Sequence, residues 1–157
     1  MESIISEVSF KRIYKYLQKI SPIFSEMWRV QGRMVLTDDD EVDTAILMIT
    51  KGNFGIKFNQ GLWKRSTIYS RVYVICHEYT HVLLGHWIDP GINDEWLNVA
   101  QDIQVNEYLK KHFSFYPTSN DAATVDVVFR EKAHKVKKDG DYRYYYDLIQ
   151  KCLKKSK

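Results

Sequence analysis

Two histidines and a glutamate in one short segment are the residues of this chain most clearly suited to chemistry. His77 and His81 flank Glu78 in the segment HEYTH. On a helix, residues four apart lie about 40° apart around the axis and roughly 6 Å apart along it, so both imidazoles can reach one metal ion. Glu78 points beside that ion, where a general base accepts a proton from a metal-bound water. The spacing predicts a hydrolytic metal site.

Zinc is the expected metal. Two neutral imidazoles, a carboxylate and an open water position form its usual catalytic arrangement, which lowers the pKa of the bound water to about 7. The same motif also occurs by chance in helices whose histidines only lie on a surface. The context favours the metal site, because an apolar helical pattern precedes the motif, Gly85 can end the helix, and an amphipathic segment with carboxylates follows.

The third ligand has several candidates. Those in range along the chain are His86, Asp94, Glu95 and Asp102. If the helix continued past Gly85, His86 would lie about 140° around the axis from His81, so His86 binds the metal only if the chain bends at the glycine. Asp102 is favoured, because it lies on the next expected helix. Asn106, one turn later, shares its face and can orient a ligand through its amide.

Two helices must position these residues. Apolar residues recur at helical spacing over residues 63–85, and no proline or glycine occurs in this stretch before Gly85. A turn at residues 89–91 separates this helix from a second one at about 94–109, which Asn93 or Asp94 can cap. The motif lies on the first helix and Asp102 on the second.

The flanking segments predict further elements. Residues 4–30 carry apolar side chains at helical spacing until Ser21-Pro22 interrupts the pattern, which predicts two helices or one broken helix. The β-rich run 44–50 and the alternating run 55–59 predict a hairpin, whose second strand is expected to offer an edge to an extended peptide. A last helix is expected from about residue 141. The fold class is α+β, mainly helical, with a small β-hairpin or sheet beside the motif helix.

Length and composition limit the classes of protein. The 157 residues suit a single domain over 1–157, and 45% hydrophobic with 27% charged residues is typical of an ordinary globular chain. A net charge of +3 does not indicate nucleic-acid binding. Cys76 and Cys152 show no disulfide framework, and neither a signal peptide nor a membrane span is evident. A cytoplasmic location is therefore expected.

Four segments resemble a known family of metallopeptidase domains, often fused to a von Willebrand factor A-like domain in bacterial and phage proteins. They are TAILMITKGNFGIKFNQGLW, VICHEYTHVLLGHW, WLNVAQDIQVN and, more loosely, YYYDLIQKCLKK. The family pattern is HExxHxxxGH followed by NxAxDxxxN. The positions that match it here are His77, Glu78, His81, Gly85, His86, Asn98, Ala100, Asp102 and Asn106.

The resemblance implies a zincin-like fold and a zinc metallopeptidase that acts on a protein or peptide. HExxHxxxGH is also similar to the membrane prenyl-protease group, whose third ligand is an acidic residue on a later helix, which favours Asp102 over His86. The expected ligands are His77, His81 and Asp102, with Glu78 catalytic. His86 and Asn106 are expected either as alternative ligands or as residues that orient the ligands.

Two questions stay open at this point. A donor to the tetrahedral oxyanion is needed, and the candidates are His86, His112, His134, Tyr142, Tyr144, Tyr145 and Tyr146. The alternative function is a catalytically silent, zinc-stabilised module that binds a protein partner. Retention of Glu78 favours the enzyme, because a structural zinc site needs no general base. An activator protein is a further expected partner.

Overall fold

The computed structural model describes residues 1–50, 53–86 and 94–155. By their internal contacts these residues form two compact units, Met1–Tyr79 and Thr80–Lys157, and each is described by itself. Helix α4 (Ile68–Leu83) contains the division. The architecture is α+β, as the sequence predicts, whereas the expected single domain stays a prediction.

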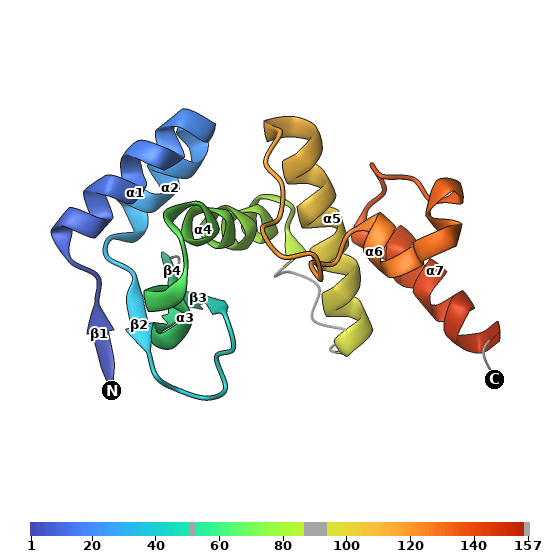
Figure 1. Cartoon of the computed structure of the whole chain (residues 1–157), viewed down its shortest axis with the longest axis horizontal. Helices are drawn as coiled ribbons and strands as arrows, with labels where there is room; N and C mark the ends of the chain where they lie inside the picture. The colour runs from blue at the N-terminus through green and yellow to red at the C-terminus, as the bar shows by residue number, and fades with distance from the viewer. Residues whose placement is uncertain (51–52, 87–93, 156–157) are drawn as a thin grey trace. The chain divides into compact units, whose positions relative to one another are not determined.

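Two helices, α1 and α2, and a four-stranded sheet make up most of the first unit (Figure 1). The elements are β1 (Glu2–Ile4), α1 (Glu7–Ile20), α2 (Pro22–Gln31), β2 (Val35–Thr37), β3 (Ala45–Thr50), β4 (Asn53–Asn59) and α3 (Gln60–Arg65). The strand order is β1-β2-β4-β3, with β2 and β4 parallel and the two outer pairings antiparallel.

Ser21 makes the break between the first two helices. Its N–H donates to the carbonyl of Leu17, the last bond of α1, while its hydroxyl accepts from the N–H of Ile23 in the first turn of α2. Proline follows at the first helical position, where its missing N–H costs nothing. The indole of Trp28 stacks on Phe10 with ring centroids 5.0 Å apart, so α1 and α2 pack as a hairpin. The predicted break at Ser21-Pro22 is confirmed.

Three expectations about this unit are wrong. Ile4, where the helical run was expected to begin, ends strand β1 instead, because its backbone pairs with β2. Strand β4 is not an edge: β2 and β3 flank it, so it has no open side for a peptide. The helix expected over 63–85 is two helices, α3 and α4, because Asn59 caps α3 early and Thr67 Oγ1 accepts the N–H of Ser70 at a new helix start.

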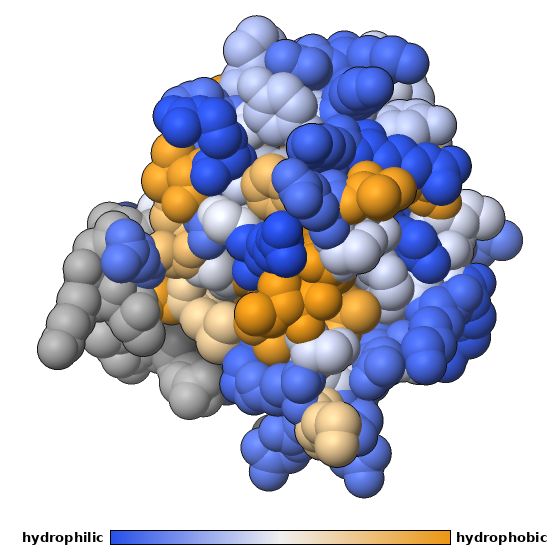
Figure 2. Space-filling view, turned by 90° about the vertical axis from the view of Figure 1, so that its left-hand side faces the viewer, coloured by the Kyte–Doolittle hydropathy of each residue, from blue (hydrophilic) through white to orange (hydrophobic). Residues whose placement is uncertain are grey.

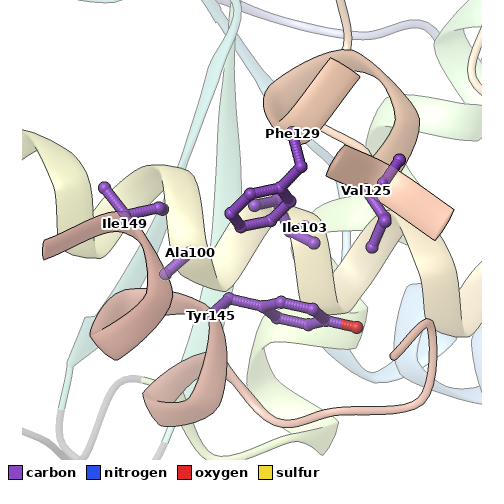
Figure 3. Packing of buried hydrophobic residues seen from close by; sticks show 7 residues of the cluster. Ala100, Ile103, Val125, Phe129, Tyr145 and Ile149 are labelled. Atoms are coloured by element: carbon purple, nitrogen blue, oxygen red, sulfur yellow. The ribbon is translucent and has the colours of Figure 1, made fainter. Parts of the chain in front are cut away.

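The second unit contains α5 (Glu95–Phe113), α6 (Val125–Phe129), the 3-10 helix η2 (Arg130–Lys135) and α7 (Tyr142–Lys155). Its core joins α5, α6 and α7, and Figure 3 shows Phe129 and Tyr145 approaching Ile103 from α6 and α7. The buried members are Ala100, Ile103, Val125, Phe129, Ala133, Tyr145 and Ile149. This packing fixes the α5 helix from which Asp102 projects.

The surface of the first unit carries several exposed apolar side chains. They are Met1, Ile4, Val8, Tyr16, Ile23, Val30, Ile46, Ile49 and Tyr69. Figure 2 shows apolar side chains gathered on one face among mostly hydrophilic ones. Among the described residues, no helix combines the length and the apolar character that a membrane crossing requires. The expected turn at residues 89–91 lies outside the described residues.

Candidate metal centre

Helix α4 carries the motif because its apolar residues repeat on one side and nothing interrupts it. Val72, Ile75, Cys76 and Tyr79 are buried, whereas His77, Glu78 and His81 are partly buried. The helix stops at Gly85, which has φ 73° and donates its N–H to the carbonyl of Val82 at 3.0 Å. A left-handed residue at this position is a common helix ending, and glycine adopts it without strain.

Asp94 starts helix α5, on which Asp102 lies. Its Oδ1 accepts the N–H of Leu97 at 2.7 Å, and its Oδ2 accepts the hydroxyl of Tyr146 at 2.7 Å. These bonds, the one from Tyr146 foremost, lower the pKa of Asp94. Among the described residues, the group that could hold a metal ion includes neither Asp94 nor Glu95.

His81 meets Asp102 directly. Nε2 of His81 lies 3.1 Å from Oδ1 of Asp102. With His77, one turn earlier on α4, they form a group whose three ligand atoms all lie within 4.8 Å of one another. Nitrogen and oxygen ligands about 2.0–2.1 Å from a tetrahedral zinc lie about 3.3 Å apart, so the spacing of His81 and Asp102 suits one shared ion.

The donor set also fits zinc by its chemistry. Two imidazoles and one carboxylate leave one position of a tetrahedral ion open, as in catalytic zinc sites. Cys76 does not add a thiolate, because its side chain is fully buried and burial raises the pKa of its thiol. Glu78 lies on α4 immediately after the first histidine and is partly buried.

His86 takes a different place from the third ligand. The bend at Gly85 brings the His86 ring back toward α4, and its Nδ1 lies 2.8 Å from Nδ1 of His81. Its Nε2 lies 2.6 Å from Oε1 of Gln104, and the ring is buried. Among the residues that the structure describes, the group of candidate ligands contains Asp102 and not His86. His86 therefore contacts the back of His81, on the nitrogen that faces away from Asp102.

Asn106 is buried on α5, and its amide donates to the carbonyl of Ala123 at 2.8 Å. This bond ties α5 to the segment before α6. The expected role of Asn106 in orienting Asp102 stays a prediction. Glu107, next to it, accepts the N–H of Val125 at 3.0 Å and so supports the same connection.

Most of the candidate oxyanion donors have other contacts. The hydroxyls of Tyr144, Tyr145 and Tyr146 bond to Lys137 N, Lys137 O and Asp94, respectively. His112 lies against the ring of Tyr108, and His134 is exposed beside the carbonyl of Glu131. Tyr142 packs on His86, with ring centroids 5.1 Å apart, and His86 packs on His81 in the same way. The donor to the oxyanion stays a prediction.

Sequence reasoning missed Gln104. Its Oε1 meets both His86 and the N–H of Tyr142. A glutamine on a helix carries no chemical signal of its own, and its two partners come from after Gly85 and from the start of α7, so the role is not visible in the sequence.

Comparisons of the chain with protein-family models, curated proteins and solved structures found no match. The site is therefore interpreted from its own geometry.

Proposed function

We propose that this protein is a zinc-dependent metallopeptidase of the zincin type, with His77, His81 and Asp102 as the metal ligands. The observation that carries the proposal is the approach of His81 Nε2 to Asp102 Oδ1 at 3.1 Å, beside a second histidine one helical turn away. The resemblance to the metallopeptidase-domain family supports the same residues. A cytoplasmic location and a protein or peptide substrate belong to the same proposal.

Each residue then has a defined task. Bound zinc would supply the Lewis acid that lowers the pKa of a water and polarises a peptide carbonyl. Glu78 accepts the proton of the attacking water and passes it to the leaving amine. His77 and His81 present their ring nitrogens from one face of α4, and Asp102 presents its carboxylate from α5.

Metal content of the purified native protein tests the ligand set. We expect about one zinc per chain by elemental mass spectrometry, and loss of that zinc in His81→Ala and in Asp102→Ala. His134→Ala, which removes an exposed histidine outside the centre, is the matched control and keeps its zinc. No bound metal in the wild type, even after zinc is supplied, would overturn the proposal.

Glu78→Gln separates the enzyme from the silent zinc module. In the enzyme this variant retains zinc but loses about 10²–10⁴-fold in hydrolysis of a mixture of unfolded proteins, because the general base is gone. In the module, the wild type and the variant bind zinc equally and neither turns over any substrate. An activator protein, added from a lysate fraction, is included in both arms so that a missing activator does not imitate the silent module.

A further inference from the structure

The amide of Gln104 has only one orientation that satisfies both of its contacts. Oε1 accepts the backbone N–H of Tyr142 at 3.0 Å and lies 2.6 Å from Nε2 of His86. A backbone N–H can only donate, so the atom that it meets must be the amide oxygen and not the amide nitrogen. The first residue of α7 thereby fixes which end of the Gln104 side chain faces His86.

This orientation determines where His86 carries its proton. An amide oxygen only accepts, so Nε2 of His86 must donate to it. In the neutral ring, Nδ1 of His86 is then an acceptor. The atom 2.8 Å away is Nδ1 of His81, which must therefore be the donor. With neutral rings, these three contacts allow one proton arrangement, from the N–H of Tyr142 to the ring of His81.

This proton arrangement also determines the state of the other ring nitrogen of His81, Nε2. With its proton on Nδ1, neutral His81 keeps a lone pair on Nε2. That lone pair faces the carboxylate of Asp102 at 3.1 Å. Two electron-rich atoms at this distance repel each other unless a proton or a metal ion lies between them. With Nδ1 already protonated, Nε2 of the neutral ring is thus the nitrogen that can bind a metal ion together with Asp102.

We propose that Gln104 is a positioning residue that fixes the metal-binding tautomer of His81 through His86. The inference rests on the proposed function, because it assumes that His81 binds zinc. The positions of the ring protons on His81 and His86, however, follow from contacts that do not involve the metal. The packing of Tyr142 on His86 holds the imidazole against rotation, with ring centroids 5.1 Å apart. Gln101 contacts His86 differently, since its Nε2 donates to the backbone carbonyl of His86 at 3.4 Å.

Three variants test whether the acceptor oxygen of Gln104 is needed. Gln104→Met preserves length and flexibility but removes the acceptor, so α5 still packs. Gln104→Glu keeps an oxygen that accepts from both the N–H of Tyr142 and Nε2 of His86. Gln101→Met is the matched control, the same substitution one turn earlier on α5.

The first measurement is the tautomer of the neutral His81 ring in the metal-free protein, from long-range ¹H–¹⁵N spectra recorded over a series of pH values. We expect Nδ1–H in the wild type, in Gln104→Glu and in Gln101→Met, and a mixture with Nε2–H in Gln104→Met. Nε2–H in the wild type, or an unchanged spectrum in Gln104→Met, would overturn the inference. The wild-type spectrum decides the matter even if a variant fails to fold.

The second measurement is zinc affinity by competition with a chelator. Loss of an outer partner of a ligating histidine weakens metal binding about 10–100-fold, and we expect this in Gln104→Met, with rescue in Gln104→Glu. An equal loss in Gln101→Met would indicate a general disturbance of the segment and would contradict the inference. If the wild type binds no zinc, the proposed function fails, and the metal-free spectra still decide the tautomer.

Discussion

His81 and Asp102 lie 21 positions apart in the sequence, yet Nε2 of the histidine and Oδ1 of the carboxylate approach to 3.1 Å. Asp102 stays partly exposed, with a side chain 41% accessible, whereas that of His81 is 17% accessible. A polar contact of this kind, open to solvent on the side of Asp102, contributes little to stability. Its value lies in the position of the two ligand atoms, and the first prediction follows from that.

Zinc should stabilise the folded protein through Asp102. A ligand that binds only the folded state at 100 times its Kd adds about 2.7 kcal/mol, which raises the Tm of a chain of this size by several degrees. In Asp102→Asn, which removes the charge but keeps the size, we expect the zinc-induced rise to fall by at least half. Thermal unfolding with and without zinc measures it, with His112→Ala as the control. An undiminished rise in Asp102→Asn would exclude this carboxylate as a ligand.

Gly85→Ala should destabilise the protein by about 1–2 kcal/mol, because the residue has φ 73° and an L side chain is strained there. The change should also weaken zinc binding, since the glycine bend places His86 behind His81. Gly55→Ala is the control: a Cβ there meets only Met48, at 3.9 Å, so we expect little effect. Urea unfolding of both variants gives the comparison, and equal stabilities would refute the argument from backbone strain.

Tyr145 should be the most sensitive aromatic residue of the second unit. Its ring is fully buried and its hydroxyl donates to the carbonyl of Lys137 at 2.7 Å. We expect Tyr145→Phe to cost about 1 kcal/mol, for the lost hydrogen bond, and Tyr145→Ala about 3–5 kcal/mol, for the cavity. Tyr144→Phe should cost less, because the hydroxyl of Tyr144 only accepts the N–H of Lys137, at 3.1 Å, in an exposed hydrogen bond. A smaller effect at Tyr145 than at Tyr144, in the same urea titrations, would contradict the packing described here.

Asp94 should make the free energy of unfolding depend on pH in the acid range. The hydroxyl of Tyr146, and then the N–H of Leu97, lower the pKa of Asp94 in the folded state. Its contribution is therefore complete above the unfolded pKa of about 3.9 and is lost as pH falls through the lower folded value. Asp94→Asn keeps a good helix cap but cannot titrate, so its stability should fall less steeply below about pH 4. If the free energy of unfolding falls equally steeply below about pH 4 in the wild type and in Asp94→Asn, this assignment is refuted.

The two cysteines should differ in reactivity. Cys76 is fully buried, and burial raises the pKa of its thiol, so few thiolates form and none is accessible. Cys152 is half-buried on α7. We expect iodoacetamide to label Cys152 in the native protein and Cys76 only after denaturation, as measured by mass spectrometry. In Cys152→Ser, native labelling at the rate of the unfolded chain would show that Cys76 is open to solvent.

The sequence predicted local features well, because each is decided by neighbouring residues. The helical motif at 77–81 follows from the 3.6-residue period, and the break at Ser21-Pro22 follows from a proline and a cap. Two of the three wrong predictions concern strand partners, and the third missed the local caps at Asn59 and Thr67 that divide residues 63–85 into two helices. Strand β1 exists because β2 pairs with it, and β4 is interior because both β2 and β3 pair with it. Neither pairing has a signal within the strand itself.

The sequence by itself thus determined that His77 and His81 share one side of a helix with Glu78 between them, since the geometry of a helix fixes residues four apart. It offered Asp102 and His86 as candidates without deciding between their roles. Only the tertiary structure decided that Asp102 faces Nε2 of His81 while His86 and Gln104 hold the other nitrogen. Those contacts depend on the turn at Gly85 and on the packing within the second unit, which distant parts of the chain create together.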